Sequence, residues 1–177
     1  MGTTIKAAIT GTGSYCQGTS GTPVGISDSE AGVTYTIFKN GTAQTPTLAG
    51  TGEAVSFGNQ TAGTYTVSGT NIYGTTEMTG SAVVTENPSP PAPAVTITQP
   101  SCVLATGTIT VTPPLGLNYS INGTDYSNTS GIFSGLAPGS YTVTARSAAG
   151  CTSPGTVAVV NTQPVLPATP GTISGSG

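Results

Sequence analysis

The stretch AGTYTVSGTN, Ala62 to Asn71, returns 76 residues later as PGSYTVTARS, Pro138 to Ser147. Both copies alternate apolar and polar residues with a period of two, which indicates a β-strand with one buried face. In YTVTA the tyrosine, the valine and the alanine face one way, and the two threonines face the other. The repeated stretch therefore predicts the same strand in two successive β-modules.

The repeat extends well beyond this strand. Seven residues of the first copy recur at the same offset of 76: Phe57, Tyr65, Val67, Gly74, Val83, Val84 and Pro88 match Phe133, Tyr141, Val143, Gly150, Val159, Val160 and Pro164. Upstream the offset grows, because Tyr35 matches Tyr119 at 84 and Cys16 matches Cys102 at 86. The first module therefore carries about eight extra residues, which we place in a longer loop at Thr42–Gly52, TAQTPTLAGTG.

Short strands separated by turn signals such as Asn40-Gly41, Asn122-Gly123 and Pro138-Gly139 predict an all-β fold, with two tandem immunoglobulin-like (Ig-like) β-sandwich domains. We expect the first domain at residues 1–87, a Pro-rich linker at 88–94, the second domain at 95–163, and the start of a further linker or tail at 164–177. The expected strands are Thr22–Ser27, Val33–Lys39, Glu53–Phe57, Thr64–Thr70, Thr76–Thr85, Val95–Thr98, Gly107–Thr112, Leu117–Ile121, Gly131–Phe133, Ser140–Arg146 and Gly155–Asn161.

The composition excludes several functions. Only 5% of the 177 residues are charged, the net charge is −3, and the chain has 35 threonines but no histidine or tryptophan. Three cations cannot form a basic nucleic-acid surface, and no apolar run approaches the roughly 20 residues of a membrane-spanning helix. The many threonines suit the solvent-facing side of a pleated sheet.

Tyr65 and Tyr141 each stand in a Gly-x-Tyr-x-Val unit at the start of the repeated strand. This unit resembles the tyrosine corner of Ig-like sandwiches, in which the ring joins the core and the hydroxyl bonds a backbone group a few residues upstream. The alternative is a strand that merely contains a buried tyrosine. We expect two tyrosine corners, which fix the crossover between the sheets.

The chain has three cysteines, Cys16, Cys102 and Cys151. We predict a Cys102–Cys151 disulfide that closes a loop of about 50 residues and stabilises the second module. The residue 76 positions before Cys151 is Thr75, so Cys16 is predicted to be a free thiol at a degenerate disulfide position. A reactive thiol or a cross-link to another chain is the alternative for Cys16. Disulfide use favours an oxidising compartment.

The sequence contains few residues of the types that catalysis or cofactor binding requires. Without histidine, Ser-His-Asp and Cys-His arrangements are impossible. The one close carboxylate pair, Asp28 and Glu30, is a weak candidate for Ca²⁺ binding and is better explained as a solvated turn. We predict no catalytic residue, no metal site and no cofactor.

Several phrases together resemble a known family: GVTYTIFKNGT, GTYTVSG and MTGSAVV in the first copy, and QPSCVLATGTITVT, YSINGTDYSNTSG and LAPGSYTVTARSAAGCTSP in the second. They are similar to Ig-like repeat modules of the large cell-surface adhesins of Bacteroidetes, of the SprB gliding-motility type, which the type IX system secretes. The resemblance implies tandem modules on a long extracellular protein. Thr75 departs from the pattern where a cysteine is expected.

We therefore expect a non-catalytic stalk segment of a secreted bacterial surface adhesin or filament, cut from a longer chain. Its expected partners are neighbouring repeats of the same chain, with self-association into filaments and a surface polysaccharide as further candidates. Two alternatives remain open: a glycan- or protein-binding module that uses Thr42–Gly52 or its tyrosines, and an accessory domain of a secreted enzyme.

Overall fold

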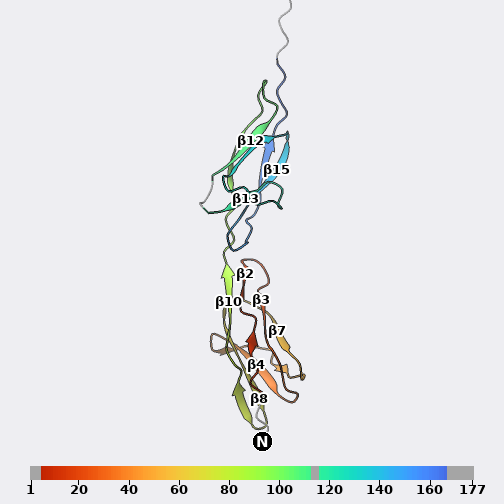
Figure 1. Cartoon of the computed structure of the whole chain (residues 1–177), viewed down its shortest axis with the longest axis vertical. Helices are drawn as coiled ribbons and strands as arrows, with labels where there is room; N and C mark the ends of the chain where they lie inside the picture. Colours follow the sequence, from red (N-terminus) through yellow and green to blue (C-terminus); the bar gives the residue numbers. More distant parts are fainter. Residues whose placement is uncertain (1–4, 113–115, 167–177) are drawn as a thin grey trace, which may run out of the picture. The chain divides into compact units, whose positions relative to one another are not determined.

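A computed structural model describes residues 5–112 and 116–166, and these residues form strands and connecting turns without any helix. No membrane-crossing helix is therefore found in these two ranges. The chain divides into two compact units between Pro88 and Ser89, here called module 1 and module 2 (Figure 1). Parts of three predicted segments lie outside the described residues: residues 1–4 of the first domain, 113–115 of the second domain and 167–177 of the tail.

Module 1 consists of two sheets. The first has the order β1-β3-β7, and the second has the order β2-β10-β8-β4-β5, with β6 also paired to β4 and β9 to β8. The strands are β1 (Ile9–Thr10), β2 (Gly13–Cys16), β3 (Thr22–Ile26), β4 (Thr34–Lys39), β5 (Thr42–Ala43), β6 (Leu48–Ala49), β7 (Val55–Gln60), β8 (Gly63–Asn71), β9 (Gly74–Glu77) and β10 (Ala82–Asn87).

Alternation along these strands places their apolar residues in one shared core. Buried side chains of β3, such as Val24 and Ile26, join those of β4 and β8, such as Tyr35, Ile37 and Val67. Because both sheets contribute to the same core, they face each other as the layers of a β-sandwich. The Asn40-Gly41 turn between β4 and β5 has positive φ at both residues, as a two-residue hairpin of this sequence requires.

Module 2 is smaller but follows the same plan. Its sheets have the orders β11-β12-β14 and β13-β15-β16. The strands are β11 (Ala94–Thr98), β12 (Gly107–Thr112), β13 (Asn118–Ser120), β14 (Ile132–Leu136), β15 (Gly139–Arg146) and β16 (Thr156–Val160). The core is built from buried residues of both sheets: Ile109, Val111, Tyr119, Val143, Ala145, Ala158 and Val160.

The two modules share one strand order. In chain order, the principal strands β3, β4, β7, β8 and β10 of module 1 correspond to β12, β13, β14, β15 and β16 of module 2. The first and third of each set pair in one sheet, and the second, fourth and fifth pair in the other. This is the order of strands B and E, and of C, F and G, in the immunoglobulin fold. The predicted fold class, two tandem Ig-like sandwiches, is confirmed.

Two details of the predicted strands are wrong. The expected single strand Thr76–Thr85 is interrupted between β9 and β10, where Gly80 adopts a φ of 84° that a continuing strand does not allow. The expected loop Thr42–Gly52 contains β5 and β6, which both pair with β4 and extend that sheet sideways. Strands of two residues leave no periodic signal in the sequence, since their order comes from the strand beside them.

Candidate functional site

The two predicted corner tyrosines occupy equivalent positions near the start of β8 and β15. The Tyr65 hydroxyl donates a hydrogen bond to the Thr61 carbonyl at 2.6 Å, and its ring is fully buried. The Tyr141 hydroxyl donates to the Ala137 carbonyl at 2.9 Å, but its ring is only half-buried. In both modules the side chain thus ties the strand to the backbone four residues upstream.

A second tyrosine lies beside the tyrosine corner of module 1. Tyr15 on β2 packs against the core of module 1, and its hydroxyl accepts a 3.2 Å hydrogen bond from the Ala62 amide beside the corner. At the offset of 86 that relates the two cysteines, the module 2 counterpart of Tyr15 is Ser101. A serine brings no ring to this position, and Tyr141 is less buried than Tyr65.

The cysteine predictions are wrong. Cys16, predicted to be a free thiol, is disulfide-bonded, and so is Cys151. Cys102, predicted to pair with Cys151, is a free cysteine. The predicted Cys102–Cys151 bond is therefore absent.

The geometry of module 2 explains why Cys102 and Cys151 do not pair. The Thr156 hydroxyl donates to the Pro93 carbonyl, so the loop that holds Cys151 lies where the chain enters the module. The Gln163 amide donates to the Cys102 carbonyl beyond the other end of β16. The five residues of β16, at ~3.3 Å each, separate these ends by roughly 16 Å, whereas a disulfide needs Cα atoms within about 7 Å.

The weak metal candidates Asp28 and Glu30 bind backbone amides. A carboxylate oxygen of Asp28 accepts from the Ser29 amide at 2.8 Å, and one of Glu30 accepts from the Ile5 amide at 3.3 Å. Within residues 5–112 and 116–166 no three potential metal-ligating side chains come together. Both carboxylates act here as local acceptors for the turn and for the entering chain.

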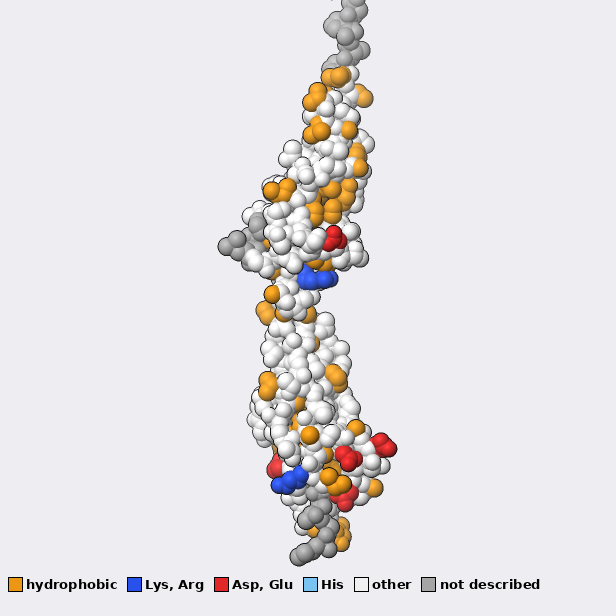
Figure 2. All heavy atoms as spheres, in the orientation of Figure 1, with side chains coloured by type: hydrophobic (Ala, Val, Ile, Leu, Met, Phe, Trp, Pro, Cys, Tyr) orange, Lys and Arg blue, Asp and Glu red, His pale blue; other side chains and the backbone are white. Residues whose placement is uncertain are grey.

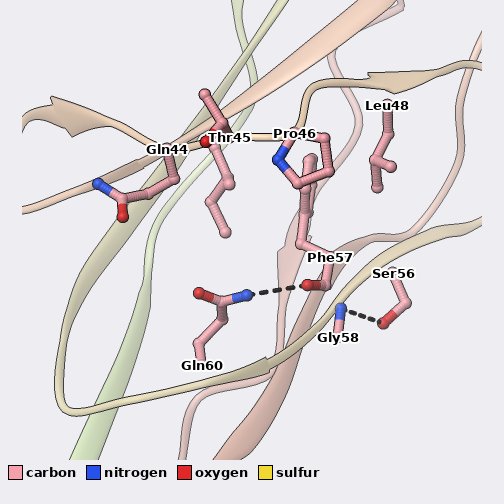
Figure 3. Close-up of a pocket in the computed structure, with 9 residues that line it drawn as sticks. Gln44, Thr45, Pro46, Leu48, Ser56, Phe57, Gly58 and Gln60 are labelled. Atoms are coloured by element: carbon pink, nitrogen blue, oxygen red, sulfur yellow. Dashed lines mark hydrogen bonds between the residues drawn. The ribbon is translucent and has the colours of Figure 1, made fainter.

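A concave site does form over the extra segment of module 1. A pocket of about 360 Å³ lies between the segment Gln44–Leu48 on one side and Ser56–Gln60 on the other (Figure 3). It is lined by Ile37, Gln44, Thr45, Pro46, Leu48, Ser56, Phe57, Gly58 and Gln60. Its volume is within the range of small-ligand sites.

Hydrogen bonds fix the orientation of the two pocket amides. The Gln60 side-chain amide donates to the Phe57 carbonyl at 2.8 Å, and that of Gln44 donates to the Thr42 carbonyl at 2.8 Å. None of the lining residues carries a formal charge, so the pocket combines apolar surface with neutral polar groups. The sequence located the extra segment, but the pocket also needs β7, whose position opposite that segment has no local signal.

Two ionisable groups of module 2 have shifted pKa values. The hydrogen bond from the Ser127 backbone amide, followed by one from the Ser127 side chain, lowers the pKa of the exposed Asp125. Burial raises the pKa of the Tyr119 phenol, because the ionised form loses its hydration. The next residue, Tyr126, packs against a cation: the Cζ atom of the Arg146 guanidinium lies 3.7 Å from the centroid of the Tyr126 ring. These groups contribute to the structure of module 2.

Neither the protein-family models nor the curated proteins contain a match to this chain. Solved structures do resemble it. An I-band fragment of titin, I67–I69, is 18% identical over 84% of this chain, with a TM-score of 0.38, and this chain spans only 65% of that fragment. Fibronectin(III)-like modules of Clostridium thermocellum CbhA are 13% identical over 88% of this chain and 94% of theirs, with a TM-score of 0.40. Murine CEACAM1b is 12% identical over 88% of this chain and 99% of its own, with a TM-score of 0.38.

Proposed function

We propose that the chain is a non-catalytic spacer in a secreted bacterial surface adhesin or surface filament. The observation that carries this proposal is the repetition of one sandwich plan within a single chain, with a tyrosine anchored at the start of the same strand each time. Modules repeated in tandem extend the reach of a protein without requiring an active site. The sequence resemblance to Bacteroidetes adhesin repeats supports the cell surface as its location.

The surface chemistry is compatible with such a role. Charged side chains are sparse on the face seen in Figure 2, where uncharged polar atoms and the backbone predominate. A surface with little charge opposes close contact between neighbouring repeats only weakly. The disulfide-bonded cysteines also support an oxidising, extracellular environment.

Single-molecule force spectroscopy on the intact chain tests the load-bearing part of this proposal. After reduction of the disulfide-bonded cysteines, we expect two separate unfolding events, one for each module, with a length gain of roughly 3.5 Å per released residue. In parallel, the chain is screened against common glycosidase and peptidase substrates. A single gradual extension at low force, or turnover that survives repurification, would contradict the spacer role.

A second candidate function, glycan binding, is favoured by the pocket of module 1. The extra segment that distinguishes module 1 from module 2 supplies one wall, and the lining residues carry no charge. Side-chain amides beside apolar and aromatic groups suit a neutral saccharide, since they offer hydrogen bonds to hydroxyls together with a surface for the sugar ring.

A glycan array probed with the intact chain tests this second function. Binding should favour neutral over sulfated or sialylated glycans, and Gln44→Ala or Gln60→Ala should weaken it about tenfold, the equivalent of one lost hydrogen bond. Asn59→Ala is the matched control, because that side chain bonds Ser20 and does not line the pocket. Absence of binding, or equal binding by all three variants, would leave the pocket without a glycan role.

A further inference from the structure

Each module has an entry end, where the chain begins its first strand, and an exit end, where the chain leaves its last strand. In module 2, Cys151 lies at the entry end, beside the Thr156–Pro93 hydrogen bond, and Cys102 lies at the exit end, where its carbonyl accepts from Gln163. The two cysteines of this module therefore belong to opposite ends.

Module 1 has the same two positions. Cys16 pairs in parallel register with Asn87 at the exit end, and the next amide, of Gln17, donates to the Asn87 carbonyl at 2.9 Å. Thr75 is at the entry end, in the β8–β9 hairpin, where its hydroxyl lies 2.9 Å from that of Thr70. Cys16 is thus the structural counterpart of Cys102, and Thr75 that of Cys151.

The oxidation states of the cysteines differ between equivalent positions. One exit-end cysteine, Cys16, and one entry-end cysteine, Cys151, are disulfide-bonded. Cys102 occupies the same position as the bonded Cys16 yet is free and only partly buried. Since its own module holds Cys151 at the far end, Cys102 has no cysteine within reach in module 2.

Exposed apolar side chains lie at the exit end of module 2 and at the entry end of module 1. At the exit end of module 2, Val103 and Leu104 follow Cys102 in the same turn and are 91% and 58% exposed. At the entry end of module 1, Ile72 and Tyr73 form the tip of the β8–β9 hairpin and are 90% and 73% exposed. Contiguous exposed apolar surface is a feature of interaction sites, and each of these two turns places two such side chains next to each other.

The corresponding residues at the other two ends are small or polar. By the same offsets, Val103 and Leu104 correspond to Gln17 and Gly18, and Ile72 and Tyr73 correspond to Ala148 and Ala149. The apolar pairs are therefore properties of these two particular ends and do not belong to the shared module plan.

We propose that Cys102 joins the exit end of module 2 to the entry end of another Ig-like module through a disulfide. The partner cysteine stands at the position that Thr75 and Cys151 share, and the partner hairpin packs its tip against Val103 and Leu104. This inference concerns how modules are joined, and it holds whether or not the parent protein is an adhesin.

The bond forms by thiol–disulfide exchange with a small oxidised disulfide such as oxidised glutathione. The Cys102 thiolate attacks one glutathione sulfur and releases one glutathione thiolate. The partner thiolate then attacks the Cys102 sulfur and releases the second. Two protein thiols are oxidised to one disulfide, and one glutathione disulfide is reduced to two glutathione molecules.

A mixed-chain experiment tests the proposal with a second copy of this chain as the partner. A tagged Thr75→Cys, Cys102→Ala variant supplies an entry-end cysteine and is mixed with the unmodified chain in a glutathione buffer. We expect one new disulfide, mapped by mass spectrometry to position 102 of one chain and position 75 of the other. The matched control variant, Thr42→Cys with Cys102→Ala, carries its cysteine on the exposed strand β5 and should cross-link about tenfold less, because no docking raises its local concentration.

Two further variants separate docking from mere thiol exposure. Tyr73→Ser in the tagged variant, or Leu104→Ser in the unmodified chain, should lower the yield towards that of the control, while thermal unfolding reports whether each chain remains folded. Equal yields from the position 75 and position 42 cysteines would overturn the proposal. So would a Cys102–Cys102 dimer as the main product.

Discussion

The two modules carry the same tyrosine in the same strand, but only one of them buries it. Tyr65 is fully buried and has Tyr15 hydrogen-bonded to the Ala62 amide beside it, whereas Tyr141 is only partly buried and Ser101 takes the place of Tyr15. Both hydroxyls nevertheless bond the carbonyl four residues upstream. The comparison teaches that the hydrogen bond of the corner is determined by the short sequence motif around the tyrosine. The hydrophobic contribution of the ring depends instead on residues far away in the sequence.

The largest expected effect is loss of the corner rings. Tyr65→Ala should destabilise module 1 by ~3–5 kcal/mol, as truncation of a buried aromatic residue does. Tyr141→Ala should cost module 2 roughly half as much, because less apolar area leaves water in the native state. Hydrogen exchange followed by mass spectrometry, read on β8 and β15 peptides, gives the free energy of opening for each module separately. Equal losses in the two modules would break the comparison.

A second contrast lies where each core tyrosine meets its neighbour across the sheet. Tyr35 pairs with Gly69, and Tyr119 pairs with Ala145. A Cβ at Gly69 would lie 3.0 Å from both the Tyr35 ring and a Val33 methyl, so Gly69→Ala should destabilise module 1 by about 1–3 kcal/mol through overpacking.

The reverse change in module 2 is the matched control. Ala145→Gly should cost only ~0.5–1 kcal/mol, the usual penalty of glycine in a strand. Urea unfolding followed by tyrosine fluorescence measures both variants. If Gly69→Ala is neutral or stabilising, the ring of Tyr35 is less tightly held than the structure indicates.

The residue beside the corner, Tyr15, can be replaced by its module 2 counterpart. Tyr15→Ser gives module 1 the residue of module 2, and we expect a loss of ~1–3 kcal/mol that reflects both the ring and its hydrogen bond to the Ala62 amide. In this background, Tyr65→Ala should cost less than it does in the unmodified chain, approaching the effect of Tyr141→Ala. A double-mutant cycle on the exchange free energies measures the coupling. Strict additivity would show that Tyr15 does not act on the corner.

The smallest expected effect is a difference in acid sensitivity. The pKa of Asp125 is lowered by its hydrogen bonds from Ser127, so the charged form is favoured in the folded state. Its contribution to stability is therefore complete above the ordinary aspartate pKa and is lost as the pH falls through the lower, folded-state value. Thermal unfolding between pH 5 and pH 2 should show a slightly steeper loss for the unmodified chain than for Asp125→Asn. Parallel pH profiles would contradict this assignment.

The sequence alone predicted those strands and turns that depend on residues adjacent in the chain. The alternation in YTVSG and YTVTA, together with the turns at Asn40-Gly41 and Pro138-Gly139, located the central strands and the sandwich class. Strands β5 and β6 were missed because two residues held by β4 leave no pattern of their own.

The cysteines and the pocket show the limit more clearly. Sequence spacing identified Cys16 and Cys102 as counterparts but could not say at which end of its module each cysteine lies. That depends on the order of the strands and on the side-chain contacts of Thr156 and Gln163. The pocket likewise requires the extra segment and β7 to face each other, which is a property of the closed sandwich.

The central claim is that the chain contains two copies of one sandwich, each with a tyrosine whose hydroxyl is anchored to the carbonyl four residues upstream. Solution NMR on the intact, isotopically labelled chain tests it most directly. We expect cross-strand contacts between β4 and β8 and between β13 and β15, and contacts from the Tyr65 ring to Val24 or Ile26 in the opposite sheet of module 1. Helical backbone shifts, a continuous core shared by both halves of the chain, or a freely solvated Tyr65 ring would contradict the account.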